Sequence, residues 1–176
     1  MPGFNVFRPA DATETAAAWY HAVTVKDAPT ALVLTRQNLP QLSGSSRDAL
    51  KGGYVLQDSG KETPDAILIA SGSEVSLAVE AKEILAGKGV DVRVVSMPCM
   101  DLFEQQSQAY KDSVLPGDVR RRVAVEALFG WERYTGLDGA VISMKSFGAS
   151  APAAKLFEKF GFTVDHVVEV VENLMK

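Results

Sequence analysis

The sequence predicts an α/β protein: a three-layer α/β/α open sheet, mostly parallel with one antiparallel edge strand, preceded by a βαβ remnant of another domain. Residues 66–70, Ala-Ile-Leu-Ile-Ala, are apolar at every position, which is typical of a strand covered on both faces. A Ser-Gly-Ser-Glu turn at 71–74 follows, and apolar residues then return at helical spacing. The next apolar run, 90–95, completes a βαβ unit with an expected right-handed crossover.

The composition is that of an ordinary globular protein, with 47% hydrophobic and 23% charged residues among 176. A net charge of −4 and a pI near 5.2 argue against a nucleic-acid-binding surface. The sequence shows no apolar segment long enough to span a bilayer and no signal peptide at its start, so we expect a cytoplasmic protein. The single cysteine, Cys99, excludes an internal disulfide, and its apolar neighbours favour a buried, inert thiol.

The first part of the chain predicts a strand at 5–8, a helix and a second strand at 31–35. Asp11 precedes Glu14 by three residues, which is typical of a capping box at the start of that helix. From residue 40 to residue 53 the composition shifts to Ser, Gly and Gln, as in a linker. We therefore divide the chain into the end of one domain (1–38), a linker (39–53) and a complete α/β domain (54–176).

The remaining elements follow from shorter patterns. Residues 54–57 predict an edge strand, and residues 101–108 predict a helix followed by an irregular connection at 110–116. Strands are expected at 123–125 and 140–144, and helices at 151–160 and 164–175. The last helix carries more apolar residues than one buried stripe needs, which favours a role in assembly. These residues are Val164, Val167, Val168, Val170, Val171, Leu174 and Met175.

Arg36 is the first candidate binding residue. It follows the predicted strand 31–35, and ligands of open α/β sheets collect at the carboxyl ends of strands. Its planar guanidinium suits a phosphate or a carboxylate. From the residues alone, pairing with a nearby carboxylate to fix the linker is an equally good interpretation.

The turn formed by Ser71, Gly72 and Ser73 is the second candidate, as an anion site at a helix start. It lacks the glycines and the lysine of a phosphate loop, and Glu74 would repel an anion. We therefore favour Ser71 or Ser73 as a helix cap. Glu126 ends the strand 123–125, and we expect it to form an ion pair rather than to act as an acid or base.

Several strings of the sequence together resemble the transketolase family, in the right order and over nearly the whole chain. They include Phe-Arg-Pro-Ala-Asp at 7–11, Leu-Thr-Arg-Gln-Asn-Leu-Pro at 34–40, Ser-Gly-Ser-Glu-Val at 71–75, Gly-Trp-Glu-Arg-Tyr at 130–134 and Phe-Gly-Ala-Ser-Ala-Pro at 147–152. The segment 127–129 is shorter than its family counterpart. The resemblance identifies residues 1–38 with the end of the pyrimidine-binding domain and residues 54–176 with the C-terminal domain.

The resemblance implies an enzyme of the pentose phosphate pathway. Transketolases use thiamine diphosphate and magnesium to move a two-carbon ketol unit from a ketose phosphate to an aldose phosphate, and they are homodimers. Arg36 matches the family arginine that holds the sugar phosphate. The catalytic residues and the cofactor and metal ligands of the family match no position here, so we expect this chain alone to bind no cofactor and to be inactive.

Two hypotheses therefore follow from the sequence. In the first, the chain supplies sugar-phosphate binding and a dimer surface to a transketolase whose N-terminal domains are joined in cis or belong to a separate subunit. In the second, it is a non-catalytic regulatory module that recognises an anion or nucleotide at the 71–74 turn. Neither involves nucleic acid or a membrane.

Overall fold

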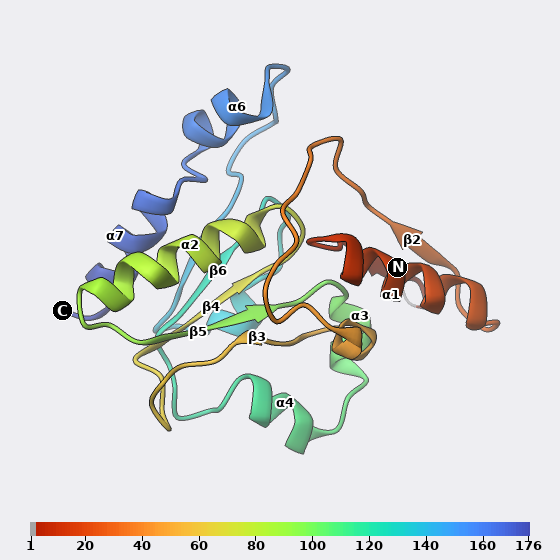
Figure 1. Cartoon of the computed structure of the whole chain (residues 1–176), viewed down its shortest axis with the longest axis horizontal. Coiled ribbons are helices and arrows are strands. Elements are labelled where there is room, and N and C mark those ends of the chain that lie inside the picture. Colours follow the sequence, from red (N-terminus) through yellow and green to blue (C-terminus); the bar gives the residue numbers. More distant parts are fainter. Residues whose placement is uncertain (1–2) are drawn as a thin grey trace.

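The computed structural model describes residues 3–176, which form a small N-terminal unit and a larger C-terminal α/β domain (Figure 1). The N-terminal unit, residues 3–38, contains β1 (Asn5–Phe7), α1 (Ala12–Thr24) and β2 (Thr30–Leu32). β1 and β2 pair in parallel, as the predicted βαβ remnant requires. Within the described residues no helix is both long and apolar enough to cross a membrane.

The C-terminal domain is built on a five-stranded sheet in the order β3-β5-β4-β6-β7. Its strands are β3 (Tyr54–Gln57), β4 (Ala66–Ala70), β5 (Val92–Ser96), β6 (Arg122–Val125) and β7 (Ala140–Ile142). Only β3 runs antiparallel, against β5, and all other pairings in this sheet are parallel. The predicted fold class, with its antiparallel edge strand, is confirmed.

Helices cover both faces of this sheet (Figure 1). On one face lie α2 (Glu74–Gly87), α6 (Ala153–Phe160) and α7 (Val164–Leu174), and on the other lie α3 (Met100–Glu104), α4 (Gln108–Val114) and α5 (Glu132–Thr135). The central strand β4 contributes Ala66, Leu68 and Ala70 to the first face and Ile67 and Ile69 to the second. All five side chains are fully buried, which confirms the interpretation of the apolar run.

The predicted linker is packed rather than extended. It contains a short 3-10 helix, η1 (Arg47–Lys51), in which Ala49 is fully buried, and η1 lies against α1. Asp11 helps to anchor the segment, because its carboxylate accepts hydrogen bonds from the backbone N–H of Leu42 at 3.1 Å and from the Ser45 hydroxyl at 2.9 Å. The linker therefore holds the N-terminal unit close to the C-terminal domain.

Two local expectations were wrong. The connection expected to be irregular at 110–116 is largely helix α4, which begins after Ser107, whose hydroxyl accepts the N–H of Tyr110. The strand expected at 31–35 ends at Leu32, because only one further ladder bond forms, from Val33 N–H to Phe7 O at 2.8 Å. After this bond, β1 offers β2 no further hydrogen-bond partner. The chain leaves the ladder at Arg8, whose N–H donates to Pro98 O, and the next residue, Pro9, has no N–H.

The apolar residues of α7 were expected to exceed one buried stripe. Val167, Val168 and Val171 are buried against α2 and β6, and the other four are partly buried against the same core. Three of the seven apolar residues are therefore used fully within the chain, and the other four keep part of their surface exposed. The assembly role that this surplus favours stays a prediction.

Candidate functional site

The carboxyl edge of the large sheet holds a buried ionic cluster, here called the Arg8 cluster and formed by Arg8, Ser71, Glu74 and Glu126. Arg8 comes from the N-terminal unit, directly after β1, and reaches across to the C-terminal domain. Ser71 directly follows β4, Glu126 directly follows β6, and Glu74 begins α2. Residues from three segments that are far apart in sequence thus meet where neighbouring strands end.

The guanidinium of Arg8 binds both carboxylates. Its Nη1 donates to Glu126 Oε1 at 2.6 Å and to the carbonyl oxygen of Ser71 at 2.8 Å. Its Nη2 donates to the two oxygens of Glu74 at 2.9 and 2.6 Å. The expectation that Glu126 forms an ion pair is confirmed, and its partner is an arginine of the other unit.

One guanidinium neutralises only one of these two carboxylates. The side chains of Glu74 and Glu126 are 2% and 0% exposed, and the Ser71 hydroxyl donates to Glu126. Burial raises the pKa of Glu126 to about 7; Arg8 opposes the increase and the charge of Glu74 adds to it. The cluster can therefore hold a proton near neutral pH.

The second buried network is centred on Glu14, the capping-box residue of α1. As expected, Asp11 caps the helix by accepting the N–H of Glu14 at 3.0 Å. In a capping box the Glu14 carboxylate would accept the backbone N–H of Asp11. Here it accepts the N–H of Ala10 at 2.7 Å and, from the other domain, the hydroxyls of Tyr54 at 2.8 Å and Ser96 at 2.6 Å. Burial raises the pKa of Glu14 while these donors oppose the change.

The residues of the predicted anion site at the 71–74 turn form hydrogen bonds with other residues of the chain. Ser73 occupies the expected N-cap position of α2, but its side chain makes no capping hydrogen bond. The Ser73 hydroxyl donates to Glu74 and the Ser71 hydroxyl to Glu126. The N–H of Gly72 donates to Arg8 O at 2.9 Å, and a side chain on Gly72 would stand 2.9 Å from the Arg8 side chain. Two carboxylates and an arginine fill the place where an anion would lie.

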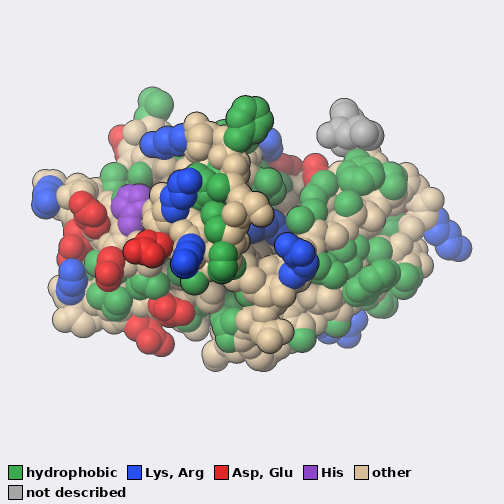
Figure 2. Space-filling view, turned by 90° about the horizontal axis from the view of Figure 1, so that it is seen from above, with side chains coloured by type: hydrophobic (Ala, Val, Ile, Leu, Met, Phe, Trp, Pro, Cys, Tyr) green, Lys and Arg blue, Asp and Glu red, His purple; other side chains and the backbone are tan. Residues whose placement is uncertain are grey.

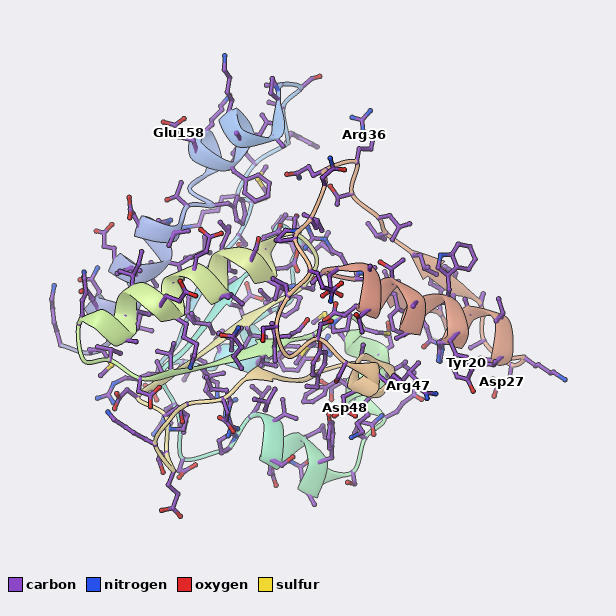
Figure 3. All side chains as sticks on the ribbon, viewed as in Figure 1. Tyr20, Asp27, Arg36, Arg47, Asp48 and Glu158 are labelled. Atoms are coloured by element: carbon purple, nitrogen blue, oxygen red, sulfur yellow. The ribbon has the colours of Figure 1, made fainter. Side chains whose placement is uncertain are left out.

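Arg36 is exposed, at the tip of the loop between β2 and η1, and its side chain points away from the sheet (Figure 3). Within residues 3–176 it forms no ion pair and donates no side-chain hydrogen bond. The loop is partly ordered by Thr35, whose hydroxyl accepts the N–H of Gln37 at 3.1 Å. The alternative in which Arg36 pairs with a carboxylate to fix the linker finds no such partner in this part of the chain.

Other candidates have structural roles. Cys99 is buried, as expected, and burial raises the pKa of its thiol to about 11. His166 contacts the carbonyl oxygen of Gly161 through Nδ1 at 2.7 Å, and His21 contacts the side chain of Asn5. Residues 3–176 contain no group of three His, Cys, Asp or Glu side chains arranged to hold a metal.

Sequence reasoning missed Arg8, although the signal was available. Arg8 stands at the carboxyl end of its strand, as Arg36 was expected to, and the same rule about strand ends applied to both. The partners of Arg8 lie 63 to 118 residues away, so no local pattern could connect them. Glu14 was recognised as a helix-start residue, but not as the centre of a contact between domains.

Comparison with known proteins finds two matching family domains in the chain. Residues 52–163 match the family described as "Transketolase-like TK C-terminal domain", and residues 1–41 match "Transketolase, pyrimidine binding domain". Transketolase of Bacillus subtilis is 55% identical over 181 residues, which cover 99% of this chain and 27% of that protein. The chain thus spans about a quarter of the length of the curated relatives it matches.

Solved structures give the same result. Transketolase from Leishmania mexicana superposes with a TM-score of 0.92 at 46% identity, covering 99% of this chain and 26% of that one. Transketolase from Pichia stipitis in complex with sedoheptulose 7-phosphate superposes with a TM-score of 0.91 at 44% identity, covering 99% and 25%. From the matched family domains and these relatives, the chain belongs to the transketolase family.

Proposed function

We propose that this chain is the C-terminal portion of a thiamine-diphosphate- and magnesium-dependent transketolase and that Arg36 binds the phosphate of its sugar substrates. The whole enzyme would transfer a two-carbon ketol unit from a ketose phosphate to an aldose phosphate. The observation that carries the proposal is the exposed guanidinium of Arg36, on a loop next to the domain boundary and without a carboxylate partner in the described residues. A related enzyme has been solved with a sugar phosphate, which supports this substrate class.

The chemistry of Arg36 suits this role. A guanidinium stays charged at every physiological pH and can donate two parallel hydrogen bonds to phosphate oxygens. Its exposure leaves these donors free until a substrate arrives. The cofactor would supply the carbanion chemistry of the reaction, and this chain would supply recognition and a rigid support.

The proposal is tested with Arg36→Ala in the complete enzyme. Loss of a charge-assisted phosphate contact is worth about 1.5–3 kcal/mol, so kcat/KM for a phosphorylated ketose should fall by roughly 10- to 100-fold. The loss should appear mainly in KM, and an unphosphorylated ketol donor should be used as well as before. Steady-state kinetics with both donors measure the difference.

Arg120→Ala is a matched control, because Arg120 is also an exposed arginine but precedes β6, at the opposite edge of the sheet, where it pairs with Asp138. It should leave both donors unaffected. An unchanged KM for phosphorylated sugars in Arg36→Ala would contradict the assignment.

We further propose that the chain contributes to assembly and is inactive without the N-terminal domains, whether these are joined in cis or form a separate subunit. Calorimetry should detect no micromolar binding of thiamine diphosphate to the 176-residue chain. Ketol transfer should appear only when the complementary polypeptide is present. Stoichiometric cofactor binding by this chain alone would refute the proposal.

A further inference from the structure

The Arg8 cluster occupies the place where an open α/β sheet usually binds its ligand. From β4 the chain moves first to β5 on one side and later to β6 on the other. The side on which new strands are added therefore switches, and the switch point lies between β4 and β6. Such a switch point leaves a crevice at the carboxyl ends of the two strands, and ligands bind there. Ser71 and Glu126 directly follow these two strands.

The occupant of this crevice is a side chain of the other unit. The Arg8 side chain is only 16% exposed, and its two terminal nitrogens donate to three residues of the C-terminal domain, Ser71, Glu74 and Glu126. The backbone fixes its approach, because Arg8 N–H donates to Pro98 O at 2.8 Å and Arg8 O accepts from Gly72 N–H. Gly72, at φ +56°, leaves the space that the Arg8 side chain fills.

The lining of the crevice is selective for a guanidinium. The carboxylates come from different elements and bind different terminal nitrogens of the same planar group. A metal ion would need more oxygen ligands, and an ammonium ion is a compact point charge that cannot present two separate nitrogens to two carboxylates. The Ser71 carbonyl and hydroxyl oxygens provide further acceptors for the Nη1 that also binds Glu126.

We propose that the switch-point crevice of the C-terminal domain is a guanidinium-binding site that Arg8 fills in cis, so that the domain acts as a receptor for its N-terminal neighbour. The site holds the two units together by a recognition contact rather than by apolar packing alone. When Arg8 is shortened, the crevice keeps its two carboxylates and binds a free guanidinium-class cation from solution.

The test is rescue of Arg8→Ala in the 176-residue chain by methylguanidinium. The substitution leaves two buried carboxylates without a cation, so the melting temperature should fall. Methylguanidinium at 1–20 mM, with ionic strength held constant by NaCl, should raise it again, by roughly 3–6 °C for each tenfold increase in cation concentration above its Kd. If Arg8→Ala is unfolded in buffer, the same titration follows recovery of the folded circular dichroism spectrum.

Three controls decide the outcome. Methylammonium should rescue far less, because it is a point charge. Wild type should not respond, because Arg8 already fills the crevice. A variant with Arg8→Ala, Glu74→Gln and Glu126→Gln together should not respond either, since the crevice then carries no charge. No recovery of Arg8→Ala with methylguanidinium, or equal recovery with methylammonium or in the triple variant, would overturn the proposal.

Discussion

At the scale of single residues, Glu126 determines how the Arg8 cluster responds to pH. Arg8 faces two buried carboxylates, Glu74 and Glu126, and it can balance the charge of one. The pKa of Glu126 is raised to about 7 in the folded chain, above its ordinary value of 4.5. The folded protein therefore binds this proton more tightly than the unfolded chain does. The contribution of this proton to the free energy of unfolding is complete below about pH 4.5 and is lost as the pH rises towards 7.

Glu126→Gln should remove this pH dependence. The amide keeps an acceptor for Arg8 but cannot ionise, so the variant should gain stability relative to wild type as the pH rises from 5 to 8. The relative gain is at most about 3 kcal/mol, from 1.36 kcal/mol per pKa unit. Urea unfolding of both proteins at several pH values measures it. Carboxylates common to both proteins, such as Asp58 and Asp65, cancel in the difference. Parallel curves for the two proteins would show that Glu126 does not titrate in this range.

The residue scale also shows what a sequence can reveal about the site. The pairing of Glu126 was predictable, because a carboxylate at the end of a buried strand needs a partner. The identity of that partner was not, since Arg8 lies 118 residues earlier. The exposure of Arg36 agrees with its proposed role, but that role depends on the family resemblance.

At the scale of elements, α1 is held against the sheet through Glu14. Tyr54, on β3, is 2% exposed and donates its hydroxyl hydrogen to the Glu14 carboxylate. Ser96, at the end of β5, provides the second hydroxyl. The helix thus contacts two strands through one buried polar group.

Tyr54→Phe should weaken this contact. The ring still packs, but the buried carboxylate loses one of its three donors, which costs about 1–3 kcal/mol of unfolding free energy. Thermal or urea denaturation would detect the loss. Tyr20→Phe is the matched control, because Tyr20 lies on the same helix, is 53% exposed and should change stability by less than about 0.5 kcal/mol.

Most elements could be predicted, and the errors had local physical causes. The helical spacing of apolar residues and the turn residues were enough to predict α2 and α7. The central strands could be predicted because burial on both faces leaves a continuous apolar run. β2 is shorter than its apolar run because β1 stops offering hydrogen bonds after Phe7. Helix α4 was missed although Ser107 is a regular cap, since its sequence carries no strong apolar period.

At the scale of the whole molecule, one group of exposed apolar side chains lies over the N-terminal unit. Figure 2 shows hydrophobic side chains gathered on that part of the molecule. Large exposed residues of the unit are Val6, Trp19, Tyr20, Val23, Val33 and Leu34. Apolar surface of this kind is typical of an interface, and in the proposed enzyme it would meet the remaining domains or the second subunit.

We therefore expect the 176-residue chain to self-associate through this surface. Trp19→Ser combined with Val23→Ser should lower the association measured by sedimentation, because the two side chains are 55% and 72% exposed. The melting temperature at low concentration should hardly change, since neither residue is in the core. Leu137→Ser, at a fully exposed position of the C-terminal domain, is the control and should leave association unchanged. Association that survives the double substitution would place the interface elsewhere.

The distance along the chain between Arg8 and its acceptors has a consequence for biosynthesis. Residues 71, 74 and 126 are translated 63, 66 and 118 positions after residue 8. While the chain emerges from the ribosome, the Arg8 side chain therefore lacks its complete set of acceptors until β6 and the following Glu126 have been made. The contact between this side chain and Glu126 therefore cannot form before residue 126 has been synthesised, because long-range contacts form only after the intervening polypeptide has closed its loop.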